Sequence, residues 1–249
     1  MFKFFSKIVG KVKEVKRGKV CAIILCAGGS TRFSNGQESK QFATIYDVPV
    51  ILRTILAFEE TESISEIILV ARKDDIDELK SLVCENGIQK VSCIVVGGST
   101  RQESAFKGFK HVSDKSTFIA IHDGARCLVT PNIIESVLAA AEKHLAATAA
   151  SKVTDTVKIS DNECFIKKTI NRENVWNVQT PQIFEKKLYT TAIYNAKQNG
   201  IEATDDCMLV ENIGYKIKLV ETGKENIKIT VKEDICLAEN ILSRRGDPI

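Results

Sequence analysis

The sequence predicts an α/β fold with a mostly parallel sheet that is covered by helices on both faces. Residues 20–26 form a continuous apolar run, typical of a strand buried on both faces. Strand-like and helix-like segments then alternate, which favours parallel strands joined by right-handed crossovers. Polar, glycine-containing segments follow several of these strands, at the edge where open parallel sheets bind ligands.

The elements follow in a regular order after this first strand. A polar loop extends to about Gln41, and a helix begins at Pro49, because proline suits the first turn of a helix. Thr130 precedes Pro131 as a helix cap, and that helix continues to about Leu145. Between these two helices the pattern predicts strands at 66–71, 91–96 and 117–121 and helices at 74–84 and 101–110.

The alternation stops between residues 152 and 178. Two β-type runs, 153–159 and 164–170, flank the polar turn 160–163 with no helix between them. We therefore predict a β-arm over about 152–174, inserted into the domain. A lone hairpin is only marginally stable, so the arm is expected to lie against another surface, such as a second subunit. A helix from Glu185, strands at 215–220 and 227–231 and a helix from about Glu233 complete one domain over 20–249.

Composition and charge exclude several classes of protein. The 249 residues are 44% apolar and 27% charged, which suits a domain with a sizeable core. Residues 1–19 carry a formal charge of +6 and the chain +3, so the remainder is mildly acidic and no nucleic-acid partner is expected. The histidines and cysteines show no metal-binding spacing. Cys21, Cys26 and Cys93 lie in apolar runs, which indicates buried free thiols in a reducing, cytoplasmic compartment.

Residues 1–19 form a basic amphipathic extension. On a helical wheel, its apolar residues gather on one side and nearly all of its basic residues on the other. A helix packed on the domain, a frayed terminus and weak contact with an anionic membrane surface all fit this pattern. No apolar run approaches the ~18 residues that would span a membrane, so no transmembrane segment is expected.

The first polar cluster lies at residues 26–32 and continues at 39–41. Gly28 and Gly29 lack a Cβ, so backbone N–H groups there can come close to a triphosphate. Arg32 and Lys40 would supply positive charge where phosphoryl oxygens gain negative charge. The spacing matches neither a P-loop nor a dinucleotide-binding loop. The alternative is an ordinary glycine turn with solvated basic side chains.

The second cluster, residues 97–104, follows the predicted strand at 91–96. Its backbone amides and serine hydroxyls, at Gly98, Ser99 and Ser104, suit the polar edge of a base. The alternative is a turn followed by a helix cap.

Two further clusters follow later strands. Asp123 suits a hard cation that bridges phosphates, and Arg126 suits an anionic substrate, with a local ion pair as the alternative. His122, next to a buried strand, is expected to be a hydrogen-bonded structural histidine. Thr204 stands at a helix-cap position, and Lys228 lies on the short strand 227–231, where a solvent-facing lysine is the alternative.

These clusters, in this order, resemble the 2-C-methyl-D-erythritol 4-phosphate cytidylyltransferase family of the non-mevalonate isoprenoid pathway. The resemblance covers about 20–242, and its most diagnostic stretches are 153–158, 175–182 and 225–230. It implies a Rossmann-like nucleotidyltransferase fold, a homodimer built through the arm, and transfer of the cytidylyl group of CTP to a small polyol phosphate with release of pyrophosphate. Magnesium or another divalent cation is expected mainly on the CTP phosphates, with Asp123 as the candidate protein ligand.

The resemblance also implies roles for individual residues. Arg32 and Lys40 would stabilise the pentacoordinate α-phosphate, and Arg172 and Lys228 would position the acceptor. Nucleotide contacts are implied at Ala27, Gly28, Gly29, Gly98, Ser99, Ser104, Asp123 and Gly124. Polyol-phosphate contacts are implied at Asp123, Arg126, Thr156, Arg172, Thr180, Thr204 and Lys228, with Thr156 and Arg172 delivered by the partner subunit.

Departures from the family and two rival functions qualify this interpretation. Ser30 replaces a usual glycine and Ser39 a usual proline, which affects the rigidity of the phosphate loop, and the loop from Arg32 to Lys40 is slightly longer. Gly124 and Cys127 replace a common alanine and proline. A ribitol-5-phosphate cytidylyltransferase would share the chemistry, although 171–176 and 204–206 resemble the methylerythritol enzyme more. A non-catalytic nucleotide-binding protein is the rival from another class, and the complete set of four catalytic cations argues against it.

Overall fold

A computed structural model describes residues 18–29, 33 and 39–246 of the chain. Most of the basic extension, together with Ser30 and Arg32, lies outside the described residues. Among those described, no helix has the length and apolar character needed to cross a membrane.

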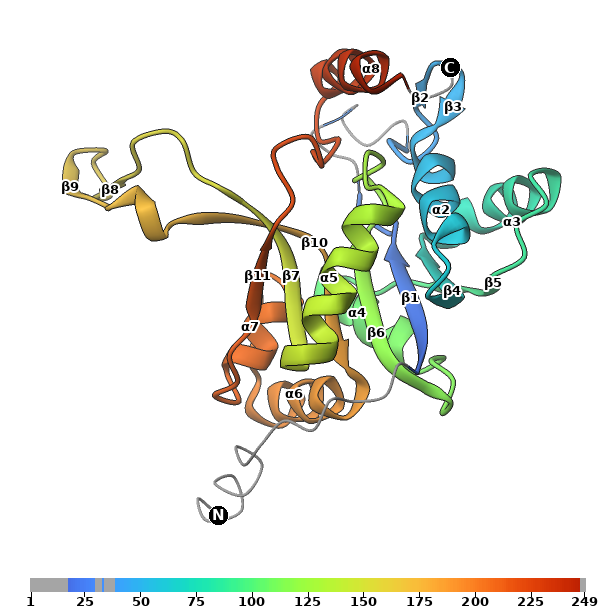
Figure 1. Ribbon diagram of the computed structural model, residues 1–249, viewed down its shortest axis with the longest axis horizontal. Helices are drawn as coiled ribbons and strands as arrows, with labels where there is room; N and C mark the ends of the chain where they lie inside the picture. The colour runs from blue at the N-terminus through green and yellow to red at the C-terminus, as the bar shows by residue number, and fades with distance from the viewer. Residues whose placement is uncertain (1–17, 30–32, 34–38, 247–249) are drawn as a thin grey trace.

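A central sheet organises the described part of the chain (Figure 1). Its order is β11-β7-β10-β6-β1-β4-β5. The strands are β1 (Lys19–Leu25), β4 (Ile64–Ala71), β5 (Val91–Val96), β6 (Ser116–Asp123), β7 (Ala146–Lys152), β10 (Trp176–Glu185) and β11 (Lys218–Glu221). β10 is antiparallel to both of its neighbours, β6 and β7, and every other pairing in this sheet is parallel. The predicted α/β class with a mostly parallel sheet is therefore confirmed.

Helices cover both faces of the sheet. α2 (Val50–Glu60), α3 (Ile76–Glu85) and α5 (Pro131–His144) pack on one face, and α4 (Arg101–Phe109), α6 (Lys186–Asn199) and α7 (Asp206–Glu211) on the other. β1 alternates between them, because Val20, Ala22 and Ile24 face the first layer and the residues between them face the second. The last helix, α8 (Glu233–Arg245), contacts a small hairpin of β2 (Thr44–Ile45) and β3 (Val48–Pro49).

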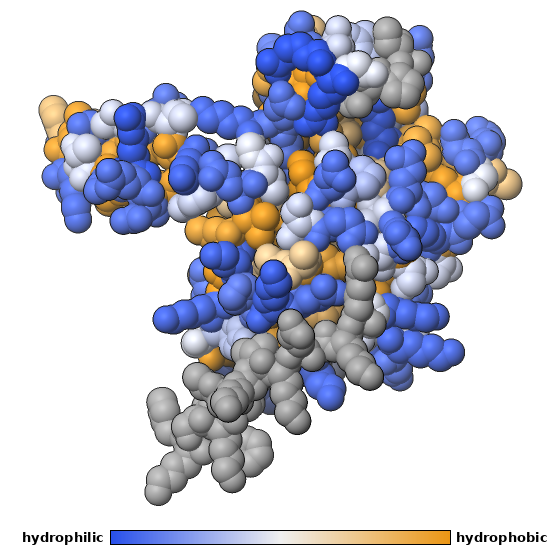
Figure 2. Space-filling model, viewed as in Figure 1, coloured by the Kyte–Doolittle hydropathy of each residue, from blue (hydrophilic) through white to orange (hydrophobic). Residues whose placement is uncertain are grey.

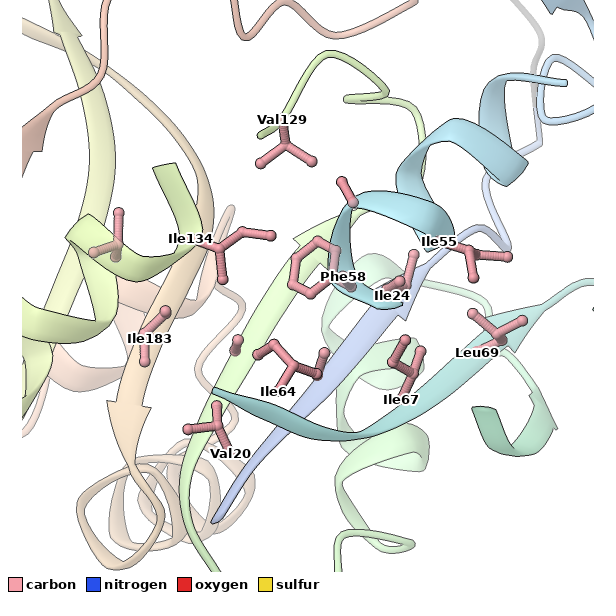
Figure 3. Close-up of a cluster of buried hydrophobic side chains, with 14 of the residues drawn as sticks. Val20, Ile24, Ile55, Phe58, Ile64, Ile67, Leu69, Val129, Ile134 and Ile183 are labelled. Carbon is pink, nitrogen blue, oxygen red and sulfur yellow. The ribbon is translucent and has the colours of Figure 1, made fainter. Parts of the chain in front are cut away.

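The larger core lies under α2 and α5 (Figure 3). Phe58 and Ile55 of α2 and Ile134 of α5 are fully buried against Ile24 and Ile67 of the sheet. Burial of each such side chain stabilises the fold by about 1.5–3 kcal/mol. This core holds the strands rigidly, and their carboxyl ends carry the polar clusters.

Helix α5 begins as the sequence predicts. The Thr130 hydroxyl accepts a hydrogen bond from the Ile133 N–H at 3.3 Å, and Pro131 occupies the first helical turn. Leu145 ends the helix in the left-handed conformation at φ 60°. By contrast, α2 begins at Val50, because Pro49 still pairs with Thr44 in the small hairpin.

Several sequence predictions need correction. β7 and β10 were not predicted as strands, and 227–231 is an extended segment outside any sheet. Thr204 does not cap a helix, since the neighbouring Asp205 carboxylate accepts the Met208 N–H at 2.9 Å and caps α7. All eight cysteines are free, but Cys93 is only half-buried.

The arm leaves the sheet after β7 and returns at β10. Its hairpin is shorter than predicted, with β8 (Lys158–Ser160) antiparallel to β9 (Ile166–Thr169), followed by a short 3₁₀ turn, η3 (Arg172–Asn174). Every residue of β8 and β9 is exposed, and the arm projects well away from the sheet (Figure 1). Its surface mixes hydrophobic with hydrophilic residues (Figure 2), and Phe165 and Ile166 are 67% and 66% exposed.

Candidate active site

The sheet topology brings the polar clusters to one edge. β1, β4, β5, β6, β7 and β11 all run in the same direction, because β10 is antiparallel to both β6 and β7, so their carboxyl ends lie together. The loop that contains Gly28 and Gly29, here called the glycine loop, follows β1. The 97–104 segment follows β5, and Asp123 ends β6. The segment with Lys228 follows β11, and the arm leaves from β7 at this edge.

A pocket of about 210 Å³ opens at this edge. Of the predicted residues it contains Ala27, Gly28, Gly29, Lys40, Gly98, Ser99, Ser104, Asp123 and Lys228. Leu25, Gln41, Thr100, Arg101 and Ala125 complete its described lining. A larger groove of about 570 Å³ lies between α4 and α6, but it contains none of the predicted residues. The smaller pocket is therefore the candidate site.

Close packing of two loops forms one wall of the pocket. A Cβ on Gly97 would lie 2.4 Å from the Cβ of Ala27, so only glycine lets the loops after β1 and β5 approach so closely. Thr100 caps α4 by accepting the Glu103 N–H at 3.0 Å, as the alternative for this cluster predicted. The buried Ser104 hydroxyl accepts the Gly98 N–H at 2.9 Å and fixes the loop. The cap and the pocket wall are thus the same structure.

Asp123 is at the centre of the charged groups. Its Oδ2 lies 2.8 Å from the Lys228 ammonium, its Oδ1 lies 3.1 Å from Arg101 Nε, and Arg126 Nε lies 3.9 Å from Oδ2. Burial alone would raise the pKa of Asp123, but the charges of Arg101 and Lys228 outweigh it and hold that pKa below its usual value. Among the described charged residues that line the pocket, Lys40, Arg101 and Lys228 outnumber Asp123. The pocket therefore suits anionic ligands.

His122 and Thr180 support Asp123 from behind. The Thr180 hydroxyl accepts the Asp123 N–H at 3.1 Å and lies 3.1 Å from His122 Nδ1. The other ring nitrogen of His122 lies 3.3 Å from the Arg126 carbonyl, and burial lowers the pKa of His122 to about 3. His122 is thus a neutral, hydrogen-bonded residue, as expected. Thr180 is buried beneath Asp123 and does not line the open pocket.

Two of the diagnostic stretches meet to position Lys228. Asn226 is fully buried, and its side-chain amide donates to the Thr180 carbonyl at 2.8 Å and to Gln179 Oε1 at 3.1 Å. The Arg126 guanidinium donates to the Asn226 carbonyl at 2.8 Å. The Ile229 N–H donates to the Ala125 carbonyl at 2.8 Å. These bonds tie the segment around Lys228 to the turn after β6 and to β10, so Lys228 faces Asp123 without belonging to a strand.

The remaining predicted residues lie elsewhere. Thr156 and Arg172 are exposed on the arm, where the Arg172 guanidinium donates to the Thr154 carbonyl. Thr204 is exposed before α7. Gly124 packs behind the pocket, where an added Cβ would lie 2.9 Å from Ile51 Cδ1. Arg32, predicted as catalytic, falls outside the described residues.

The described residues do not offer a resident magnesium site at Asp123. Both of its carboxylate oxygens face cationic groups, Arg101 on one side and Lys228 on the other. A metal ion there would have to displace a guanidinium or an ammonium. Among the described residues, no group of three or more acidic, histidine or cysteine side chains is arranged for a metal.

Arg101 and Asp206 were not predicted as site residues. Arg101 lines the pocket and bridges Asp123 and the buried Asp206, whose Oδ2 lies 2.6 Å from Arg101 Nη1. The local sequence gave little indication that these two residues belong to the site. Arg101 fits the first residue of a helix, and Asp206 fits an acidic first turn of a helix. Their partners lie 22 and 105 residues away along the chain.

Comparisons with known proteins identify the family of the chain. A family model described as 2-C-methyl-D-erythritol 4-phosphate cytidylyltransferase matches residues 20–244. The protein of that name from Alkaliphilus oremlandii is 40% identical over 92% of this chain and 97% of its own. Its namesake from Caldanaerobacter subterraneus subsp. tengcongensis is 42% identical over 90% and 99%.

Solved structures point the same way. The 4-diphosphocytidyl-2C-methyl-D-erythritol synthase of Anaerococcus prevotii superposes with a TM-score of 0.82 at 32% identity, covering 94% of this chain and 100% of that one. The cytidylyltransferase of Thermus thermophilus gives a TM-score of 0.72 at 28% identity, with 90% and 99% covered. With its nucleotidyltransferase fold and its match over nearly the whole length, the chain belongs to the 2-C-methyl-D-erythritol 4-phosphate cytidylyltransferase family.

Proposed function

We propose that this protein transfers the cytidylyl group of CTP to 2-C-methyl-D-erythritol 4-phosphate and releases pyrophosphate. The observation that carries the proposal is the pocket where the glycine loop, the 97–104 loop and the cations Lys40, Lys228 and Arg101 meet around Asp123. Family membership supports the choice of nucleotide and acceptor.

The chemistry needs alignment and charge neutralisation more than acid–base catalysis. An oxygen of the acceptor phosphate attacks the α-phosphorus of CTP, the bond from that phosphorus to the β-phosphate oxygen breaks, and pyrophosphate leaves with the electron pair. The acceptor phosphate is already anionic, because its second pKa is about 6. Lys40 would stabilise the negative charge that develops on the α-phosphate in the transition state, and Lys228 would bind the acceptor phosphate.

Arg126 is suited to the acceptor phosphate. Its side chain is 14% exposed, and its buried Nε has no hydrogen-bond partner among the described residues. A buried donor without a partner costs about 1–3 kcal/mol, and a bound phosphate oxygen would remove that cost. We propose the same anionic acceptor for Arg126 and Lys228, which both lie near Oδ2 of Asp123.

Magnesium would enter as the complex with CTP. Asp123 does not fit a resident ion, because both of its oxygens are paired with cations. The ion would therefore be held by the CTP phosphates, where it offsets charge that repels the incoming acceptor. Cytidylyl transfer should be lost when a chelator removes divalent cations and return when magnesium is added.

We further propose a homodimer in which each arm completes the site of its partner. The exposed side chains of Phe165 and Ile166 support this, because burying large apolar side chains against a second subunit would stabilise a hairpin that is only marginally stable alone. Arg172 and Thr156, predicted acceptor contacts, lie on the same arm and outside the pocket. For the compartment we propose the cytoplasm, which suits the free thiols buried at Cys21 and Cys26.

Pyrophosphate release tests the proposed reaction. The protein is incubated with CTP and magnesium, and with 2-C-methyl-D-erythritol 4-phosphate, ribitol 5-phosphate or no acceptor. We expect rapid release with the methylerythritol phosphate, much slower release with ribitol phosphate, and none without an acceptor. Equal or faster turnover of ribitol 5-phosphate would assign the rival substrate, and no release with any acceptor would favour the non-catalytic alternative.

A further inference from the structure

A buried carboxylate lies behind the pocket and has no role in the proposed chemistry. Asp206 is the first residue of α7 and is 1% exposed. Its Oδ2 lies 2.6 Å from Arg101 Nη1, and its Oδ1 accepts a hydrogen bond from the buried Tyr189 hydroxyl. Its backbone N–H donates to Gln182 Oε1 at 3.0 Å. Contacts from α4, α6 and β10 thus fix its position.

Arg101 transmits this fixed position into the pocket. While Nη1 donates to Asp206 Oδ2, Nε of the same guanidinium donates to Asp123 Oδ1 at 3.1 Å. Burial alone would lower the pKa of Arg101, but Asp206 and Asp123 together raise it, so the charge is held firmly. A guanidinium is planar and offers several donors in fixed directions, which lets it bridge two carboxylates where a lysine would serve only one.

The bridge determines which oxygen of Asp123 is left for Lys228. Because Arg101 occupies Oδ1, Oδ2 is the oxygen that faces the Lys228 ammonium at 2.8 Å. If Arg101 lost Asp206, its guanidinium would be held from one side only, and the Asp123 carboxylate could rotate. Lys228 would then lose its fixed partner. We infer that Asp206 is a positioning residue for Lys228, acting through Arg101 and Asp123.

The inference rests on the proposed cytidylyl transfer for its kinetic consequence. Lys228 is on the acceptor side of the site, so a displaced ammonium should weaken binding of the polyol phosphate more than binding of CTP. A role limited to docking α7 on the sheet would instead lower stability and affect both substrates alike. The two roles therefore differ in how the two KM values respond.

Asp206→Asn is the decisive variant, with Asp205→Asn as its matched control. The change at Asp206 keeps the size of the side chain but removes the charge that holds Arg101. The control removes the neighbouring charge and the bond from Gln182 Nε2, while an asparagine still caps α7 and Arg101 is untouched. For Asp206→Asn we expect the KM for 2-C-methyl-D-erythritol 4-phosphate to rise about tenfold and the KM for CTP to change less than about twofold. The control should leave both values near wild type.

A second readout does not depend on turnover. The lysines are dimethylated with ¹³C-formaldehyde, and the Lys228 resonance is assigned with Lys228→Arg. Asp206→Asn should shift this resonance and Asp205→Asn should not. If Asp206→Asn fails to fold, Arg101→Lys replaces it, because a lysine keeps the charge but cannot span both carboxylates.

The outcomes separate this inference from the proposed function. An unchanged Lys228 resonance in Asp206→Asn overturns the positioning role, as does an equal rise of both KM values. If the wild-type protein releases no pyrophosphate with any acceptor, the proposed function fails, and the resonance alone still decides whether Asp206 positions Lys228.

Discussion

At the scale of single residues, the site is organised by one carboxylate among several cations. Asp123 neutralises part of the positive charge of Arg101, Lys228 and Arg126 and fixes where their side chains point. With Lys40 in the same pocket, the balance stays positive, which is what two phosphorylated substrates require. Lys40 should therefore act more on the charge of the transition state than on the stability of the fold.

Lys40→Ala tests this in the loop after β1. We expect kcat to fall about 10²-fold or more, because one donor to a developing charge is lost, while the thermal unfolding midpoint stays unchanged. Arg32→Ala should behave in the same way. Lys216→Ala, an exposed lysine remote from the pocket, is the control. Wild-type turnover in Lys40→Ala would show that the loop after β1 is only a turn.

His122 gives the stability a defined dependence on pH. Burial lowers its pKa in the folded protein to about 3, whereas an exposed histidine has a pKa of about 6.5. As the pH falls below about 6.5, the unfolded chain takes up a proton that the folded protein does not, so the free energy of unfolding falls by up to about 1.4 kcal/mol per pH unit until about pH 3.

Urea unfolding at a series of pH values checks this effect. His122→Gln has no imidazole to protonate, so its free energy of unfolding should fall less steeply than that of wild type between about pH 6.5 and pH 4. Parallel curves for the two proteins would mean that His122 titrates normally and is not buried as a neutral ring.

At the scale of elements, the sequence predicted those with a strong periodic signal. The strand 91–96 and the helix that Thr130 caps have the predicted position, because apolar spacing and capping are local properties. β7 was missed because Ala146–Lys152 is rich in alanine, which has low β propensity but fits between two packed layers. β10 was missed because its polar residues are buried through distant partners, as when Gln182 binds Asp205 and the Asp206 N–H.

The candidate site likewise contains residues that local sequence predicts and residues that depend on distant partners. Glycine loops and the basic residues after strands could be recognised from local pattern, and most of them line one pocket. The Arg101–Asp206 bridge could not, because it joins two helices that are adjacent only in space. Lys228 was assigned to a strand, whereas tertiary bonds through Asn226 hold it in an extended segment.

The exposed arm carries a prediction of its own. Phe165→Asp should shift the protein from dimer to monomer in sedimentation, because a charge in a covered apolar contact costs more than it does in water. The free energy of unfolding of the monomer should change little, since Phe165 is 67% exposed in the single chain. Tyr194→Asp, an equally drastic change at a 53% exposed residue of α6, is the control. Dissociation by both variants, or by neither, would remove the arm as the dimer contact.

At the scale of the whole molecule, the sheet and the arm carry different parts of the proposed site. Parallel strands bring the nucleotide loops, Asp123 and Lys228 to one edge, while the arm carries Arg172 away from it. A two-fold dimer would return each Arg172 to the pocket of the other subunit, and such dimers are the commonest closed assembly. The central claim is thus a cytidylyltransferase site built from two chains.

Mixing two inactive variants tests this claim most directly. Lys40→Ala and Arg172→Ala are each expected to be nearly inactive in pyrophosphate release from CTP and 2-C-methyl-D-erythritol 4-phosphate. After random subunit exchange, half of the dimers are mixed, and each mixed dimer has one intact site of two. We therefore predict recovery of about a quarter of wild-type activity. No recovery, with subunit exchange demonstrated by differently tagged chains, would place Arg172 in the site of its own subunit and contradict the account.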